Sequence, residues 1–422
     1  MMKKISLLTI SVLLSGCASF GEGVATAFLE KQEQEDLREC RVDGKGFGGM
    51  QQSFDESSHS LKVLMVHGVG THVPGYSTQF KEKLAVELQL PVKSSRYKEI
   101  HLVNKEFPDQ GLGVLRIERL LNKGQQSREM LFYELTWSAI TNPEKEKLKY
   151  DTSGAYSFHR AEVNQMLKEF SNDTSPDPMI YLGKSKEEIL ASFRTAFCWM
   201  VGRDWDALPD YSESECHIDG DAIKHLPDDE YAIVSHSLGS RIVMDGMHSF
   251  AQRMVIASNG GYTQLESGVL DGFIDGFQQK SIPFYLMSNQ LPLLEMGEEP
   301  PEVINQQKEY CVAGGEHYNK RLVNKTSIIA FSDPNDLLSY AIPQHFAEHN
   351  LDSRLCAEIT NVNINVAHVI DMFGFGKFAN PLTAHTGYDS DDRVVALIAN
   401  GIGSDKTSEL ISERCKWTEF VD

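Results

Sequence analysis

The sequence predicts an α/β fold with a mostly parallel central sheet flanked by helices. Three observations support this prediction. First, residues 61–66, 282–287 and 326–331 are apolar runs with the length of a buried strand. Second, helical patterns lie between these runs, and strands that alternate with helices are typical of a parallel sheet. Third, residues 231–243 combine an apolar β-type run, a tight turn and a helical run. The chain has 422 residues, 41% of them hydrophobic, which suffices for a sizeable core.

The turn within residues 231–243 carries a serine at its tip, Ser237. This is the layout of a nucleophile elbow, in which a strained strand–turn–helix connection lifts a serine hydroxyl off the end of a sheet. The residues two before and two after that serine must then be small, and here they are Ser235 and Gly239. The usual pattern is G-x-S-x-G, from which the chain departs at Ser235. The alternative is an ordinary strand–loop–helix connection that contains serines.

The predicted strand at 61–66 leads directly into His67-Gly68-Val69. Backbone N–H groups just after such a glycine can stabilise an oxyanion. We predict Val69 as the first oxyanion donor, with Gly68 as the alternate. The second predicted donor is the N–H of Leu238, at the start of the elbow helix, where the helix dipole also favours negative charge. His67 lies at the strand end and is predicted to be structural.

A long segment separates a predicted strand at 130–137 from the elbow. The patterns at 156–170 and 184–201 predict helices, and we expect a helical insertion over about residues 140–225. The second of these helices has an apolar stripe, which fits either core packing or a cap over a substrate entrance. The stripe consists of Ile189, Phe193, Phe197 and Met200.

A nucleophilic serine needs a general base within hydrogen-bond reach, and the base needs an acid that orients it. We expect the acid in the loop after the strand at 326–331, where Asp336 is preferred and Asp333 is the alternate. Asp333 precedes a proline, and this is the kind of residue that caps a turn. Turn capping is also the non-catalytic interpretation of either aspartate.

The general base is expected after the last predicted strand, an alternating pattern at 358–366. We place it at His385, in a loop over 372–390 that precedes a helix starting near Asp391. The alternate is His368, whose parity with the strand favours a partly buried position at the strand end. The non-catalytic interpretation of His385 is a solvated loop histidine.

Taken in chain order, these landmarks resemble the α/β-hydrolases of the serine esterase/lipase type, over about residues 61–402. The resemblance implies an α/β-hydrolase fold and hydrolysis of carboxylic (acyl or lipid) esters through an acyl-enzyme. It implies Ser237 as nucleophile, His385 as base and Asp336 as the orienting acid, and no cofactor. Thioesterases, amidases and acyltransferases share this machinery. The alternative from another class is a non-catalytic envelope protein that uses the fold as a binding scaffold.

The first residues predict export. Two lysines precede an apolar stretch that is too short to span a bilayer, and residues 1–16 are therefore interpreted as a signal peptide. Residues 14–17, Leu-Ser-Gly-Cys, resemble a bacterial lipobox, which implies that Cys17 carries the lipid (palmitate among its acyl chains). Ala18 after it implies outer-membrane sorting. We expect a lipidated tether over residues 17–58 and the hydrolase domain over 59–422. The alternative is an ordinary secretory signal with an incidental cysteine.

The net charge of the chain limits the classes of partner that it can bind. The formal net charge of −20 argues against nucleic acid and against electrostatic docking on anionic lipid. The expected partners are an acyl-ester substrate and, through the lipid anchor, a membrane of the bacterial cell envelope.

No close cysteine pair has zinc-type spacing, so no metal site is proposed. Six cysteines remain besides Cys17, and the oxidising periplasm favours disulfides. On proximity and on tying the two ends of the chain, we pair Cys198 with Cys216, Cys311 with Cys356 and Cys40 with Cys415.

Overall fold

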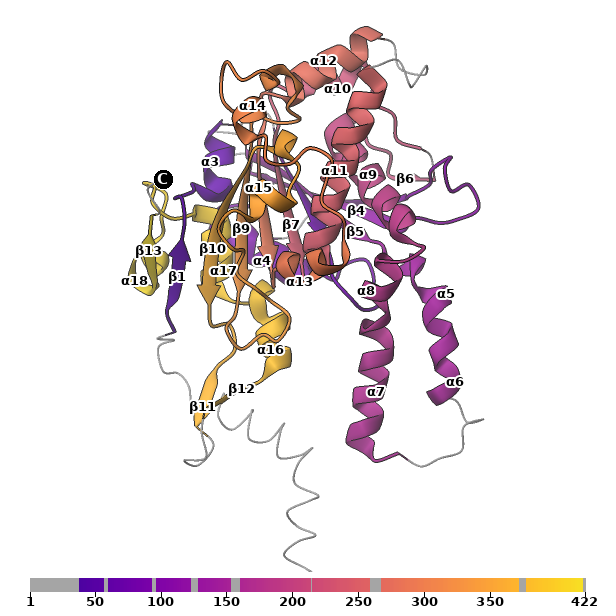
Figure 1. Cartoon of the computed structure of the whole chain (residues 1–422), viewed down its shortest axis with the longest axis vertical. Helices are drawn as coiled ribbons and strands as arrows, with labels where there is room; N and C mark the ends of the chain where they lie inside the picture. The colour runs from indigo at the N-terminus through magenta and orange to yellow at the C-terminus, as the bar shows by residue number, and fades with distance from the viewer. Residues whose placement is uncertain are drawn as a thin grey trace, which may run out of the picture.

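The computed structural model describes residues 38–419 apart from 57–59, 93–95, 123–127, 153–159, 214, 259–266 and 372–376. Its centre is an 11-stranded sheet in the order β13-β1-β10-β9-β8-β7-β2-β5-β4-β3-β6 (Figure 1). The strands of this sheet are β1 (Cys40–Asp43), β2 (Leu61–Val66), β3 (Tyr97–His101), β4 (Val114–Asn122), β5 (Arg128–Thr136), β6 (Tyr211–Ser212), β7 (Glu230–His236), β8 (Ser281–Met287), β9 (Lys325–Ser332), β10 (Ala357–Ile364) and β13 (Cys415–Thr418). A separate hairpin pairs β11 (Val369–Asp371) with β12 (Lys377–Ala379).

The middle of the large sheet is parallel. Parallel pairings alone join β5, β2, β7, β8, β9 and β10, while β4, β3 and β1 add antiparallel pairings at the two sides. Every residue of β2 is buried. Leu64 and Val66 pack into one hydrophobic cluster, and Val63 and Met65 pack into the other. A strand covered on both faces needs a continuous apolar run, which is why the sequence predicted this sheet, and the predicted α/β fold is confirmed.

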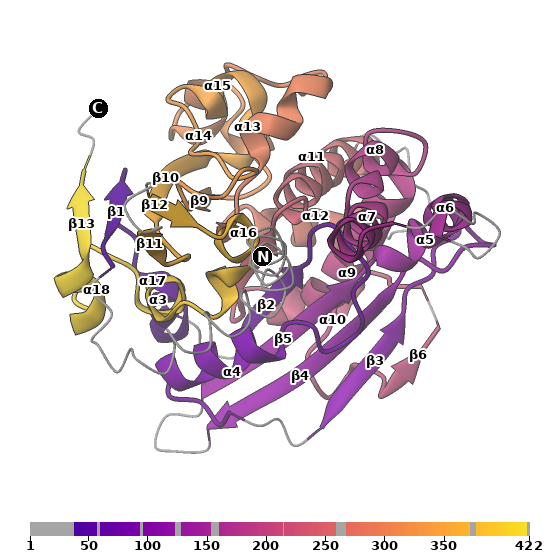
Figure 2. The same ribbon diagram turned by 90° about the horizontal axis from the view of Figure 1, so that it is seen from below.

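Helices cover both faces of the sheet (Figures 1 and 2). The cluster on one face contains side chains of α9, α11 and α12, and the cluster on the other contains side chains of α3, α4 and α17. The helices are α3 (Gly49–Glu56), α4 (Thr78–Glu87), α5 (Asn142–Lys145), α6 (Lys149–Thr152), α7 (Glu162–Thr174), α8 (Pro176–Tyr181), α9 (Lys186–Gly202), α10 (Gly220–His225), α11 (Gly239–Ser258), α12 (Ser267–Phe277), α13 (Leu291–Leu294), α14 (Gln307–Cys311), α15 (Phe346–Asn350), α16 (Pro381–Thr386), α17 (Asp392–Asn400) and α18 (Glu409–Arg414).

The predicted helical insertion between β5 and β7 has two distinct parts. α9 belongs to the core, since its apolar stripe is buried together with side chains of β2, β5 and α11. Core packing, and not a cap, is therefore the role of that stripe. α7 differs, because none of its side chains is buried. In Figure 1, α5, α6 and α7 extend below the sheet.

Residues 38–56 belong to the folded domain, so the predicted tether over 17–58 is wrong for this part. β1 pairs with β10 and β13, and α3 packs against α17. Four glycines, at positions 44, 46, 48 and 49, lie between β1 and the start of α3. Gly44 and Gly49 have φ angles of +136° and +64°, which glycine adopts without strain. Glycine content therefore marks the turn but conceals the strand before it and the helix after it.

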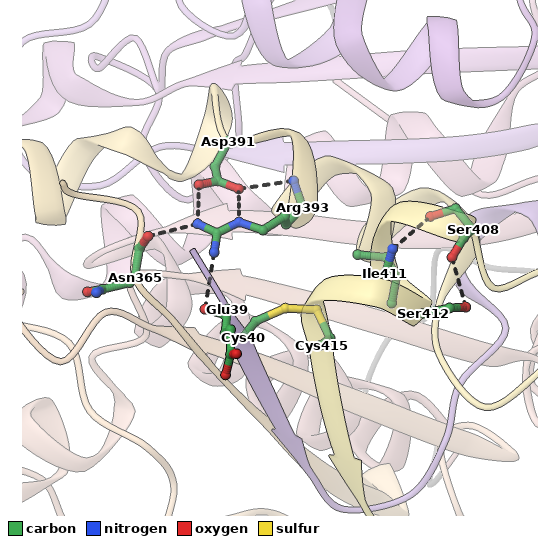
Figure 3. Close-up of a disulfide and its surroundings, with 9 residues drawn as sticks. All are labelled: Glu39, Cys40, Asn365, Asp391, Arg393, Ser408, Ile411, Ser412 and Cys415. Atoms are coloured by element: carbon green, nitrogen blue, oxygen red, sulfur yellow. Dashed lines mark hydrogen bonds and ion pairs between the residues drawn. A yellow bond between two sulfur atoms is a disulfide. The ribbon is translucent and has the colours of Figure 1, made fainter. Parts of the chain in front are cut away.

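Figure 3 shows how this edge of the sheet is closed. A disulfide joins Cys40 of β1 to Cys415 of β13. Nearby, the buried guanidinium of Arg393 donates to the carbonyl oxygen of Glu39 over 3.1 Å and to that of Asn365 over 2.7 Å. The first described residues are thus attached to both β10 and the helix layer.

Two further disulfides join Cys198 to Cys216 and Cys311 to Cys356, so all three predicted pairs are present. Among the described helices, none is long and apolar enough to cross a membrane. The predicted signal peptide over 1–16 and the predicted lipid attachment at Cys17 lie outside the described residues.

Candidate active site

The turn between β7 and α11 holds Ser237 in the left-handed region, with a φ angle of +55°. A serine is rare in this conformation, and strain of this kind is concentrated at functional sites. The Ser237 N–H donates to the carbonyl oxygen of Met287 at the end of β8 over 2.9 Å. A Cβ atom on Gly239 would lie 2.6 Å from the carbonyl oxygen of Val66, so the end of β2 leaves no room for a side chain there. Close packing against β2 is the reason for the small residue after the turn.

His385 lies beside this serine. Its Nε2 is 3.1 Å from Ser237 Oγ, and its Nδ1 is 3.0 and 3.1 Å from the two carboxylate oxygens of Asp336. Ser237 is fully buried, whereas the imidazole of His385 keeps 12% of its side-chain surface exposed. The structure thus brings together the three residues that the sequence had placed in catalytic roles, although they are separated by up to 148 positions.

His385 lies in a short helix and not in the predicted loop over 372–390. α16 begins with a proline at its first turn, and the Asn380 side chain caps it by accepting from the N–H groups of Leu382 and Thr383. Proline and a capping asparagine are favourable at this end of a helix, so the signals for α16 are present in the sequence. The predicted helix after it is α17, and Asp391 caps that helix as expected.

Asp336 lies in a tight turn after β9. Its N–H donates to the carbonyl oxygen of Asp333, and its Oδ1 accepts from the Leu338 N–H over 2.9 Å. Burial alone would raise the pKa of this carboxyl, but the hydrogen bond and charge of His385, with the hydrogen bonds from the Leu338 N–H and Ser288, together outweigh burial and lower the pKa. The carboxylate is therefore ionised at neutral pH.

The two alternates occupy other positions. The Asp333 carboxylate accepts from the N–H groups of Val366 and Ala367, over 2.8 and 3.0 Å, and from the Asn335 N–H over 2.7 Å. It therefore holds the loop after β9 against the end of β10. His368 is exposed beyond the end of β10, so the expected partly buried position for it is wrong. The strand ends at Ile364, so the alternation of side chains between its two faces does not extend to residue 368.

Ser288 is a member of the cluster that the sequence interpretation missed. It directly follows β8 and also has a left-handed backbone, with a φ angle of +49°. Its Oγ donates to Asp336 Oδ2 over 2.7 Å and lies 3.0 Å from His385 Nδ1. A serine placed immediately after a predicted parallel strand was the available signal. Tyr388 adds a longer contact from its hydroxyl to Asp336 Oδ2, 3.4 Å.

Two further histidines surround the site without contacting Ser237 Oγ by a hydrogen bond. His67 Nε2 accepts from the Trp137 N–H over 3.1 Å, so its Nδ1 carries the proton and donates to the Gly68 carbonyl oxygen over 2.8 Å. His236 Nε2 donates to the carbonyl oxygen of His385 over 2.8 Å. Burial lowers the pKa of His67 well below its ordinary value and lowers that of His236 to about 3. Both rings are therefore neutral parts of the scaffold.

The predicted oxyanion donors adjoin the serine. A Cβ atom on Gly68 would lie 2.6 Å from Ser237 Cβ, so the segment that leads to Val69 passes directly over the nucleophile. Leu238 follows the serine and is buried at the start of α11. Within the part of the chain that the structure describes, neither the Val69 nor the Leu238 N–H donates to a protein acceptor. Their role as oxyanion donors stays a prediction.

The insertion is attached to the same loop. The Gly70 N–H donates to Asp177 Oδ2 over 2.7 Å, and the Thr71 N–H donates to Asp173 Oδ2 over 2.9 Å. Lys145 forms a buried ion pair with Asp177 at 2.8 Å. Two carboxylates and a lysine of the insertion thus fix the backbone that follows Val69.

The described residues hold no group of three or more histidine, cysteine, aspartate or glutamate side chains that could bind a metal ion. The arrangement of Ser237, His385 and Asp336 has the geometry of a nucleophile, a general base and the acid that orients the base. Comparison of the chain with family models, with curated proteins and with solved structures finds no match.

Proposed function

We propose that this protein is a serine hydrolase of the α/β-hydrolase type that cleaves carboxylic esters, with acyl or lipid esters as the substrate class. The observation that carries the proposal is the chain of contacts from Ser237 Oγ through His385 to Asp336, at the end of a strand–turn–helix elbow. Three residue types in this geometry, with a strained serine at the tip, are what acyl transfer through a serine requires.

The proposed reaction begins with Ser237 Oγ attacking the ester carbonyl carbon while His385 Nε2 takes the hydroxyl proton. Asp336 accepts the hydrogen bond from Nδ1–H, which leaves the Nε2 lone pair facing the serine and stabilises the imidazolium. The N–H groups of Val69 and Leu238 would bind the oxyanion. The tetrahedral intermediate collapses as the alcohol leaves with the proton from Nε2. Water, deprotonated by His385, then hydrolyses the acyl-enzyme and restores Ser237.

The cellular setting is also part of the proposal. Residues 1–16 would be removed as a signal peptide, and Cys17 would carry the lipid that tethers the domain to the bacterial outer membrane. Three disulfides in the folded domain support an oxidising compartment. Labelling of Cys17 by radioactive palmitate in cells, and loss of the label in Cys17→Ser, tests this part separately from catalysis.

Labelling with a fluorophosphonate probe tests the catalytic part. Phosphonylation of the full chain should modify Ser237, identified by peptide mass spectrometry, and Ser237→Ala should abolish it. Ser235→Ala is the matched control, since Ser235 is a buried serine two residues away and should not be needed for labelling. Folded wild-type protein that takes up no more probe than Ser237→Ala would reject the hydrolase and favour the binding scaffold.

A further inference from the structure

α7 exposes an apolar stripe that nothing in the described chain covers. Val163, Met166, Leu167 and Phe170 recur at the i, i+3, i+4 and i+7 spacing of one helix face. Each is between 52% and 68% exposed, and no side chain of α7 is buried. An amphipathic helix of a globular domain normally turns this face to the core. A contiguous exposed apolar face of this kind marks an interaction site.

The stripe ends beside the loop that follows Val69, which adjoins the candidate active site. Thr174 continues the same face, four residues after Phe170, and its methyl group lies 3.6 Å from where a Cβ on Gly70 would be. The other side of α7 faces α5 and α6, where Glu169 and Asn172 line a polar cavity with Lys145. The apolar face therefore extends outward from the loop that follows Val69.

Other exposed apolar side chains gather at the same end of the sheet. They lie in segments that follow the carboxyl ends of β2, β9 and β10, as Ser237 follows that of β7. In Figure 1, α16 and the β11–β12 hairpin extend below the sheet, as α7 does, and Figure 2 views the molecule from that side. These exposed side chains are Val73, Leu337, Val369, Ile370, Phe378 and Leu382.

The chain also joins the folded domain at this end. Cys40 pairs with Ile364, the last residue of the antiparallel neighbour β10, so β1 starts at the carboxyl edge of the parallel strands. Arg38, the first described residue, donates to the carbonyl oxygen of Asn365 over 3.0 Å. The described chain therefore begins, on the side toward the proposed lipidated Cys17, at the edge of the sheet that carries the active site.

The charge of this region points to an apolar occupant. Residues 142–184 contain seven acidic and six basic residues and are nearly neutral, whereas the whole chain has a formal charge of −20. Exposed lysines of the insertion are paired with neighbouring glutamates, as Lys147 and Lys184 are with Glu144. Burial of apolar side chains, and not attraction to anionic headgroups, is the available driving force.

From these observations we propose that the apolar stripe of α7 and the exposed apolar side chains at the carboxyl edge of the sheet dock on a lipid bilayer. Docking in this orientation would turn the edge of the sheet that carries Ser237 toward the membrane to which Cys17 is proposed to anchor the chain, and this part rests on the proposed lipid attachment. The surface is formed by separate projections and not by a groove, which suits a planar lipid surface.

Quenching by brominated lipid tests the proposal. The full chain is reconstituted into phosphatidylcholine vesicles, and a tryptophan is introduced on the stripe as Leu167→Trp. The matched control is Val255→Trp, an exposed position near the end of α11 that is remote from its start at Gly239. Both variants carry Ser237→Ala, so that the result does not depend on hydrolysis. Emission is measured as the difference from the parent protein without the added tryptophan.

We expect bromine on the lipid acyl chains to remove about half of the emission of Leu167→Trp and little of that of Val255→Trp, since docked helices bury their apolar face about 5–10 Å into the headgroup and acyl boundary. Equal quenching of the two variants would overturn the proposal. A blue shift of Leu167→Trp that depends on protein concentration without vesicles would also overturn it, in favour of a second copy of the chain. Either result leaves the fluorophosphonate test of Ser237 untouched.

Discussion

Replacement of Asp336 by asparagine separates the orienting role of this residue from the fold around it. The carboxylate oxygens lie 3.0 and 3.1 Å from His385 Nδ1, so they keep a proton on that nitrogen. Asparagine has one acceptor oxygen, and the Leu338 N–H and the Ser288 hydroxyl both require an acceptor at this position. The amide NH₂ is then left to donate to Nδ1. This moves the ring proton to Nε2, which can no longer accept the proton of Ser237.

The wrong tautomer should lower kcat/KM by about 10³–10⁴-fold, equivalent to about 4–5.5 kcal/mol of transition-state stabilisation. The fold should be retained, since the substitution preserves shape. Asp333→Asn is the matched control, because its carboxylate accepts backbone N–H groups of Val366 and Ala367 instead of the imidazole. Hydrogen bonds to a charged group contribute about 1.5–3 kcal/mol each, so this variant should lose about 2–4 kcal/mol of unfolding free energy.

Initial rates with a short p-nitrophenyl ester measure the first effect, and urea unfolding followed by circular dichroism measures the second. Asp333→Asn should keep its activity per folded molecule to within about tenfold. The opposite pattern, with a folded Asp333→Asn inactive and Asp336→Asn active, would refute the assignment of the acid.

Three further predictions follow from individual contacts. Ser288→Ala should lower kcat by about fivefold to twentyfold in ester-hydrolysis assays, and it should also lower the unfolding free energy in urea by about 1.5–3 kcal/mol, since one hydrogen bond to a buried charged group is lost. Burial lowers the pKa of His236 to about 3, so between that value and its ordinary value the unfolded chain binds a proton that the native ring does not. Native stability therefore falls on acidification below about pH 6.5, with a slope of about 1.4 kcal/mol per pH unit from this ring. His236→Gln should remove that part of the slope in urea titrations, and an unchanged slope in this variant would contradict the prediction. Loss of the Cys40–Cys415 disulfide, which closes a separation of 375 residues, should lower the unfolding free energy by up to about 6 kcal/mol; a Cys40→Ser/Cys415→Ser variant with the wild-type urea midpoint would contradict this.

Local sequence signals predicted the centre of the sheet but not its sides. β2, β8 and β9 are largely buried on both faces, so their mainly apolar runs identify them without reference to neighbours. β4 and β1 have alternating or short patterns, and what makes them strands is the adjacent edge with which they pair. The same limit applies to residues 38–56. The glycines of this segment are visible in the local sequence, but the strand with which β1 pairs is more than 300 positions away.

The sequence by itself determined which residue types were available at the site and in which order. Ser237 on a strand–turn–helix stretch, an aspartate after a late strand and a histidine near the last helix are all local patterns, because they depend on neighbours within a few positions. It favoured Asp336 over Asp333 without excluding Asp333, and it did not detect the role of Ser288. Those assignments depend on which side chains meet across the carboxyl edge of the sheet, and that is decided by tertiary pairing.

Tertiary structure also decided whether the apolar face of α7 is covered. An amphipathic pattern states that a helix has an apolar face, and only the packing of the surrounding chain determines whether that face is covered. In α9 the apolar stripe is buried against the sheet, whereas in α7 it is exposed. The physical reason is that periodicity is a property of one segment, while burial is a property of the segment and of everything that packs against it.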